Sequence, residues 1–179
     1  MSITDREFWT SLHGMIFGAG FLLTFAGGVV GLLTLRAQWM TAEGAKASLR
    51  RLMVVTWAMA VLAWTAVLIG TYLIYPWYRA EPPAGASDLS LQEFPRSLLL
   101  SRAQTAGWHQ FGMEWKEHLA WFAPILATAV AYTVTRQRSS LLNDSSLRRM
   151  LLALLAVSFF CAAIAGLLGA FINKAAPLR

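Results

Sequence analysis

Charged residues are scarce in this chain. Only 13% of its 179 residues are Asp, Glu, Lys or Arg, whereas 57% are hydrophobic. A soluble domain usually carries about 25% charged residues. A soluble protein of this size has too much surface for its volume to bury so many apolar side chains. The shortage of charge therefore excludes a soluble globular domain and indicates that lipid surrounds most of the chain.

Cysteine is nearly absent, and so are the usual motifs of nucleotide binding and acyl transfer. The single cysteine, Cys161, lies in an apolar run, which excludes a disulfide within the chain and a thiolate metal site. The sequence contains neither a phosphate-binding Gly-Lys-Ser/Thr loop nor a G-x-S-x-G elbow. The N-terminal MSITDREFW lacks the basic stretch of a signal peptide, so we expect the first apolar run to be retained.

Four apolar runs are each long enough to cross a bilayer, which takes about 20 helical residues. The runs are continuous, which is typical of helices and not of the alternating strands of a barrel. The third run is short, must borrow length from the amphipathic WHQFGMEWKEH before it, and contains Pro124, which should kink it. The sequence predicts an all-α integral membrane protein, a single domain with four helices in an up-down-up-down bundle. The expected spans are residues 9–35, 52–77, 112–135 and 150–172.

The charges predict how this bundle is oriented. The loops at residues 36–51 and 136–149 together hold eight basic and two acidic residues, and the rest of the chain holds seven of each. Basic loops remain in the cytoplasm, so the positive charge indicates orientation and not nucleic-acid binding. We expect a bacterial inner (cytoplasmic) membrane protein with both termini and the long loop at residues 78–111 in the periplasm. An aromatic belt at this outer level fits that orientation: Trp9, Tyr75, Trp77, Tyr78, Trp108 and Trp115.

Two of the three histidines fall at a matched depth near the outer surface. His13 lies about one turn into the first span and His118 lies at the head of the third, and these two helices run in the same direction. Histidines on facing helices of a bundle are typical haem ligands. Nearby glycines would leave room for the macrocycle, and nearby cations would reach its propionates. The predicted haem-binding residues are His13, His118, Gly14, Gly18, Arg79 and Lys116.

The sequence therefore predicts a membrane b-type cytochrome subunit with one haem b between the first and third helices. A haem near the outer surface would carry electrons between quinol and a periplasmic redox partner such as a cytochrome c. No second histidine pair is available for transfer across the whole bilayer. We expect an electron-transfer subunit of a larger oxidoreductase complex and not an independent enzyme. Its partners would be membrane lipids and either other membrane subunits or copies of itself.

Three alternatives use the same part of the chain differently. His118 with Glu114, Glu117, His109 or His13 would offer nitrogen and oxygen ligands to copper, zinc or iron. The same histidines and carboxylates would otherwise line a quinone pocket and exchange protons with it. The third alternative is a cofactor-free structural or anchoring subunit.

Helix geometry and glycine spacing bear on these alternatives. His109 precedes His118 by nine residues and would lie on the opposite face of a continued helix, so we expect it in the loop or at the interface. In an anchoring subunit, Gly14 and Gly18 would serve helix packing alone. The same spacing recurs at Gly27 and Gly31, far from any histidine.

Overall fold

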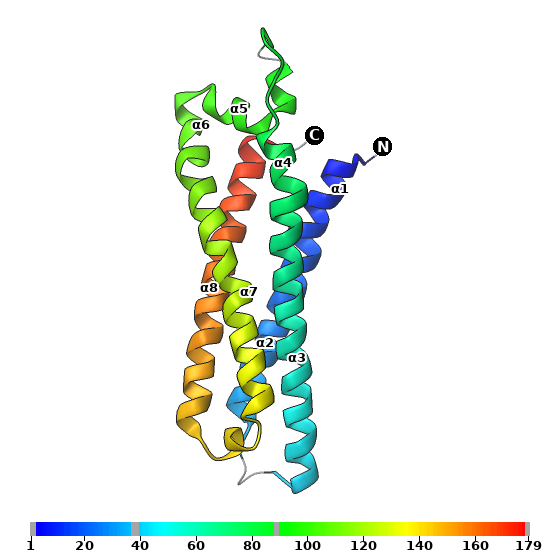
Figure 1. The fold of residues 1–179 in the computed structure, drawn as a ribbon, viewed down its shortest axis with the longest axis vertical. Coiled ribbons are helices and arrows are strands. Elements are labelled where there is room, and N and C mark those ends of the chain that lie inside the picture. Colours follow the sequence, from blue (N-terminus) through cyan, green and yellow to red (C-terminus); the bar gives the residue numbers. More distant parts are fainter. Residues whose placement is uncertain (1–2, 37–39, 88–89, 178–179) are drawn as a thin grey trace. The chain divides into compact units, whose positions relative to one another are not determined.

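A computed structural model describes residues 3–36, 40–87 and 90–177. Every regular element within these ranges is helical, and none is a strand (Figure 1). Four helical stretches in the described residues are long and apolar enough to cross a membrane. The prediction of an all-α chain with four candidate spans is thereby confirmed. These spans are Asp5–Thr34, Ala42–Arg79, Ala103–Arg136 and Ser145–Ala175.

The first span consists of α1 (Asp5–Ser11), the π-helical η1 (Leu12–Phe17) and α2 (Gly18–Thr34). A capping box fixes its start. The Thr4 hydroxyl accepts a hydrogen bond from the Glu7 amide at 3.2 Å, and the Glu7 carboxylate accepts one from the Thr4 amide at 2.9 Å. This cap explains why the helix begins earlier than the apolar run does.

The second span has the same construction. It consists of α3 (Ala42–Ile69), the π-helical η3 (Gly70–Ile74) and α4 (Tyr75–Arg79). The connection after it contains the short helices η4 (Ser90–Glu93) and α5 (Pro95–Leu100). Proline stands at the start of α5, where its missing N–H leaves no helical hydrogen bond unmade.

The third span begins before the predicted boundary, because the amphipathic stretch is helical. It consists of α6 (Ala103–Gly107), the π-helical η5 (Trp108–Met113) and α7 (Glu114–Arg136), with Pro124 buried inside α7. The turn η6 (Ser140–Leu142) leads into α8 (Ser145–Ala175). The Asp144 carboxylate accepts from the Leu147 amide at 2.9 Å and so caps α8.

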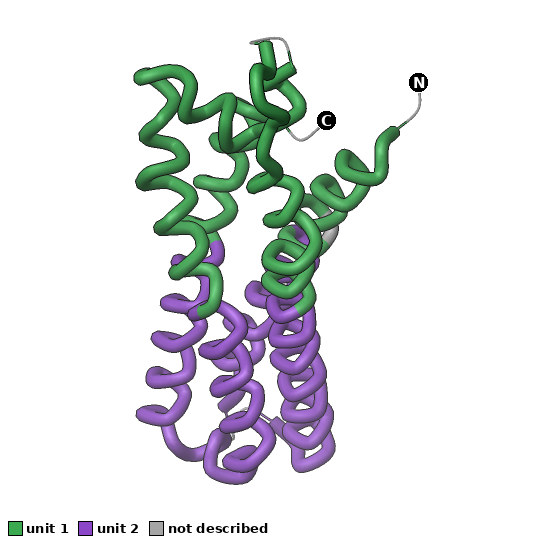
Figure 2. Tube along the Cα trace, turned by 45° about the horizontal axis from the view of Figure 1, so that its top comes forward, with its two compact units in different colours: residues 1–18, 65–121, 163–179 green, residues 19–64, 122–162 purple. Residues whose placement is uncertain are grey.

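The chain divides into two compact units, to which every span contributes (Figure 2). Unit 1 comprises residues 1–18, 65–121 and 163–179. Unit 2 comprises residues 19–64 and 122–162. Each unit has an apolar core of its own. The prediction of one domain over the whole chain stays a prediction.

Unit 2 packs segments of α2, α3, α7 and α8 around an apolar core. Glycines bring α2 close to α3: a Cβ at Gly27 would lie 3.0 Å from the Val55 Cγ1, and one at Gly31 would lie 3.0 Å from the Leu52 Cδ1. Small residues allow such close approach of membrane helices. The buried core residues are Phe21, Leu32, Leu35, Leu52, Met59, Ala60, Ala63, Ala127, Val130, Val134, Leu141, Leu151 and Leu155.

Unit 1 has a smaller core, which joins the end of the second span to the connection and to α8. Its buried members are Tyr78, Leu99, Met113, Ile172 and Ala176. Tyr78 is the one polar side chain among them, and its hydroxyl is hydrogen-bonded. Further polar residues of unit 1 form the candidate site.

Candidate functional site

Three π-helical segments occur in the described residues, and all three lie in unit 1. His13 lies in η1, Gly70 begins η3, and His109 lies in η5. A π-helical turn holds one residue more than an α-helical turn and is frequent at functional sites. The side chains around these three segments are therefore candidates for a functional site.

His13 lies half-buried against the second span. A Cβ at Gly70 would lie 2.9 Å from the His13 Cε1, so only glycine leaves room for the ring at this place. The Ala66 carbonyl is within hydrogen-bonding reach of the ring. The His13 Nδ1 is buried without a partner, and so is the hydroxyl of Thr10, which lies one turn earlier on the same face. Span 1 thus presents two unpaired polar groups to the interior of unit 1.

Lys116 enters this interior from α7 and packs against α8. A Cβ at Gly169 would lie 2.9 Å from the Lys116 Cε, so this glycine makes space for the lysine side chain. The ammonium group lies close enough to interact electrostatically with His13 and with Glu117. Ionisable groups within a membrane span are costly and usually mark functional sites.

Glu117 is the second charged group that α7 directs inward. The Tyr75 phenol is within hydrogen-bonding reach of its carboxylate, while the Glu117 Oε1 is buried and has no partner. Arg79 also contacts this tyrosine. Its Nη1 donates to the Tyr75 hydroxyl at 3.1 Å, and its guanidinium carbon lies 5.5 Å from the centroid of the Tyr75 ring. We define the polar site as Thr10, His13, Tyr75, Lys116 and Glu117.

A chain of polar contacts extends from the end of the second span into the connection. The Arg96 Nε donates to the His109 Nε2 at 3.4 Å, and the His109 Nδ1 lies 2.9 Å from the Tyr78 hydroxyl. Because guanidinium nitrogens only donate, the His109 Nε2 must accept, which places the proton on Nδ1. Arg96 also lies 3.7 Å from the Glu81 carboxylate. His109 lies in the helical η5 and not in a loop, and its contacts join the end of the second span to α5.

His118 has different surroundings from His13. Its Nδ1 lies 2.7 Å from the backbone carbonyl of Glu114, so its proton is on Nδ1 and Nε2 is directed outward. The residue is exposed on the same outward face of the helix as Phe111 and Trp115. Glu114, Trp115, His118 and Leu119 line an open hollow of about 260 Å³ there. The prediction of a haem between His13 and His118 stays a prediction.

The other predicted site residues do not share one environment. Gly14 and Gly18 have no atom within 4 Å of an added Cβ, so they make no close helix contact with the described residues. Lys116 belongs to the polar site, and Arg79 contacts it through Tyr75. The residues of the predicted alternative metal site are separated, since Glu117 and His109 point inward while Glu114 and His118 are exposed. No group of three or more His, Cys, Asp or Glu in the described ranges could hold a metal ion.

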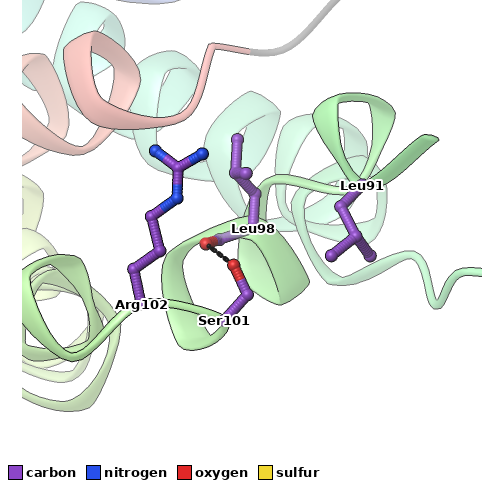
Figure 3. Close-up of a pocket in the computed structure, with 4 residues that line it drawn as sticks. All are labelled: Leu91, Leu98, Ser101 and Arg102. Atoms are coloured by element: carbon purple, nitrogen blue, oxygen red, sulfur yellow. Dashed lines mark hydrogen bonds between the residues drawn. The ribbon is translucent and has the colours of Figure 1, made fainter. Parts of the chain in front are cut away.

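A second, smaller hollow lies in the connection. It measures about 90 Å³ and is lined by Leu91, Leu98, Ser101 and Arg102 (Figure 3). The Ser101 hydroxyl is already bonded to the Leu98 carbonyl at 2.8 Å. Arg102 is the one charged group of this lining and is exposed. This hollow therefore adds nothing to the polar site.

Several residues of the site are missed by sequence reasoning. The aromatic belt includes Tyr75 and Tyr78 but does not predict their contacts with Glu117 and His109. Gly70 and Gly169 carry no local signal, because the need for glycine there is set by side chains from other helices. A signal that could have been used is the inward face shared by Thr10 and His13, three residues apart.

Comparisons of this chain with protein-family models, with curated proteins and with solved structures gave no match. The function is therefore argued from the residues and their geometry.

Proposed function

We propose that the chain is a four-span subunit of a bacterial inner-membrane complex, with its helices in an up-down-up-down bundle. The loops at residues 36–51 and 136–149 face the cytoplasm, and both termini and the long connection face the periplasm. The charges support this orientation: unit 2 carries eight basic and two acidic residues, and unit 1 carries seven of each. Excess Lys and Arg mark the cytoplasmic side of membrane proteins.

The polar site, in this proposal, binds the head group of a membrane quinone or quinol and takes part in electron transfer to a periplasmic redox partner. One observation carries the proposal. Three buried polar atoms, the Thr10 Oγ1, the His13 Nδ1 and the Glu117 Oε1, have no partner among the described residues. Buried polar atoms in native proteins nearly always have one, and each exception calls for a bound molecule or another explanation.

The chemistry of these residues suits a quinone better than a simple anion or cation. A quinone carries two carbonyl oxygens on an apolar ring, and the site offers hydrogen-bond donors from Lys116, Tyr75 and Thr10. A quinol, when bound, supplies two electrons and two protons. His13 and Glu117 are the bases that would accept the protons, and the electrons would pass one at a time to two molecules of the redox partner.

Protons held at the site need a route to water. Tyr75 and Tyr78 stack with their ring centroids 6.2 Å apart. Tyr78 is hydrogen-bonded to His109, and His109 contacts Arg96 of the connection. Phenol and imidazole groups both donate and accept hydrogen bonds. The hydrogen bond between Tyr78 and His109 would form the outer part of a proton route toward the periplasmic side, and a water between the two tyrosine hydroxyls would complete it.

Glu117 and Glu114 provide a matched pair of variants on one helix. Glu117→Gln should weaken the binding of a short-chain ubiquinol or menaquinol to the purified protein under reducing conditions by about 10- to 100-fold, because a quinol hydroxyl donates to the carboxylate and a hydrogen bond to a charged group is then lost. Glu114→Gln, at the exposed position one turn away, should leave the affinity unchanged. Quenching of tryptophan fluorescence on titration would report binding. Equal affinity of both variants and the parent protein would overturn the proposal.

A haem b is the second candidate, and the Glu114 carbonyl bonded to the His118 Nδ1 favours it. Histidines that ligate metals usually donate their other N–H in this way. A reduced-minus-oxidised spectrum of the purified protein tests it. Loss of the haem b band in both His13→Ala and His118→Ala supports a haem between the two residues, and loss in His118→Ala alone supports a haem at the outward face. A spectrum without the band overturns both. If neither quinone nor haem binds, the cofactor-free anchoring subunit is the remaining candidate.

A further inference from the structure

Three helices of unit 2 carry a stripe of exposed apolar side chains that ends in an exposed arginine. On α3, Arg50 is followed at helical spacing by Val54, Trp57 and Val61. On α7, Phe122, Ile125 and Tyr132 lead to Arg136. On α8, Arg149 precedes Val157 and Phe160. All eight apolar and aromatic residues are between 40% and 60% exposed.

The three arginines lie at the same end of unit 2. Figure 1 shows the start of α3, the end of α7 and the start of α8 together there. The guanidinium groups of Arg50, Arg136 and Arg149 form no hydrogen bond or ion pair with another described residue. The acidic residues of unit 2 are only Glu43 and Asp144, and Asp144 is engaged in capping α8.

The neighbouring Arg148 shows that not every arginine at this end is available. Its NH1 donates to the Leu141 carbonyl at 2.6 Å and to the Leu142 carbonyl at 3.2 Å, so it holds the turn before α8. Arg149, one residue later, is exposed and lies at the end of the apolar stripe of α8. Adjacent arginines thus have separate roles.

We propose that this end of unit 2 binds anionic phospholipids of the bilayer, with the head-group phosphate at the arginines and an acyl chain along each stripe. Guanidinium groups bind phosphate oxygens through paired hydrogen bonds. Basic clusters beside membrane spans attract anionic lipids. The stripe supplies the second half of the site, because a lipid has an apolar chain directly below its phosphate.

The test compares phosphatidylglycerol with phosphatidylcholine of the same acyl chains, added to the delipidated protein and counted by native mass spectrometry. The triple variant R50Q/R136Q/R149Q should bind phosphatidylglycerol less tightly by about five-fold for each cation removed, with a smaller loss for phosphatidylcholine, because its choline offsets the charge of its phosphate. The control R102Q/K174Q removes two exposed cations of unit 1 and should bind both lipids as the parent does. The double variant Val54→Ser with Val61→Ser should weaken the binding of both lipids.

Three outcomes would overturn the proposal. One is unchanged phosphatidylglycerol binding by the triple variant, and another is an equal loss in the unit 1 control. The third is full displacement of the lipid by inorganic phosphate, which would indicate a phosphate site without a role for the stripes. Because the three arginines are exposed, the variants should fold, and an unchanged circular dichroism melt would confirm it. This proposal is independent of the quinone site.

Discussion

Unit 1 and unit 2 share the same four spans but treat their buried polar groups in opposite ways. In unit 2 the buried hydroxyls of Thr56 and Ser158 donate to the carbonyls of Leu52 and Ala123, each at 2.9 Å. In unit 1 the buried polar atoms of Thr10, His13 and Glu117 have no partner among the described residues. In unit 2 these hydroxyls make their hydrogen bonds within the unit, whereas in unit 1 these polar atoms remain available to hydrogen-bond a bound molecule.

Backbone and charge follow the same division. The π-helical segments of the described chain lie in unit 1, while the span segments of unit 2 are α-helical and surround a larger apolar core. The net charge of +6 belongs to unit 2, and unit 1 is neutral. Regular, well-packed helices stabilise and orient the protein, whereas irregular turns and buried ionisable groups are tolerated where they serve binding. From this comparison we expect most of the stability to come from unit 2, while the proposed quinone chemistry belongs to unit 1.

The largest expected effect is a loss of stability from unit 2. Leu155 is fully buried in its core, and Leu155→Ala should cost about 2 kcal/mol. This is below the usual range for buried leucines, because in lipid the loss is mainly that of packing and not of transfer from water. Titration with a denaturing detergent, followed by circular dichroism, measures it. Leu167→Ala, at a 57% exposed position of the same helix in unit 1, should have little effect; equal losses would contradict the comparison.

Two glycine substitutions test the difference between the two units. In unit 2, Gly27→Ala would press on Val55, which is β-branched and cannot turn away easily, and should cost about 1–2 kcal/mol of stability. In unit 1, Gly169→Ala would press on the flexible end of Lys116, which can move. Stability should change less there, but the ammonium group would leave the polar site. The expected result is loss of quinone affinity in Gly169→Ala alone, measured as for Glu117→Gln.

The four spans follow from apolar run length, and Pro124 inside the third helix was expected. Boundaries differ because capping and amphipathic residues extend helices beyond their apolar parts: α1 begins at Asp5, and the third span begins at Ala103. The predicted loop at residues 78–111 is shorter for that reason. Hydropathy indicates which residues tolerate lipid, but it does not indicate where the backbone hydrogen bonds of a helix begin.

The candidate site was harder to predict than the spans. His13, Lys116 and Glu117 were named from the sequence, but their neighbours were not. Depth can be counted along a helix, but which way a side chain points depends on the helical phase, and each π-helical turn shifts that phase by about one residue, or roughly 100°. His118 is exposed on the outward face of α7, and its depth in the membrane stays a prediction. The contacts of Lys116 with Gly169 and of His13 with Gly70 depend on the register between helices, which no local pattern specifies.

The smallest expected effect concerns single hydroxyl groups and tests the comparison most directly. Ser158→Ala removes a made hydrogen bond in unit 2 and should cost about 0.6 kcal/mol, the average for such bonds between membrane helices. Thr10→Val removes an unpaired hydroxyl in unit 1. Because a buried polar group without a partner is unfavourable, this change should leave stability unchanged or raise it, while weakening quinone binding. Detergent unfolding and the quinone titration together measure both. A stability loss in Thr10→Val equal to that in Ser158→Ala would mean that the threonine is bonded within the protein, and unit 1 would then differ from unit 2 less than proposed.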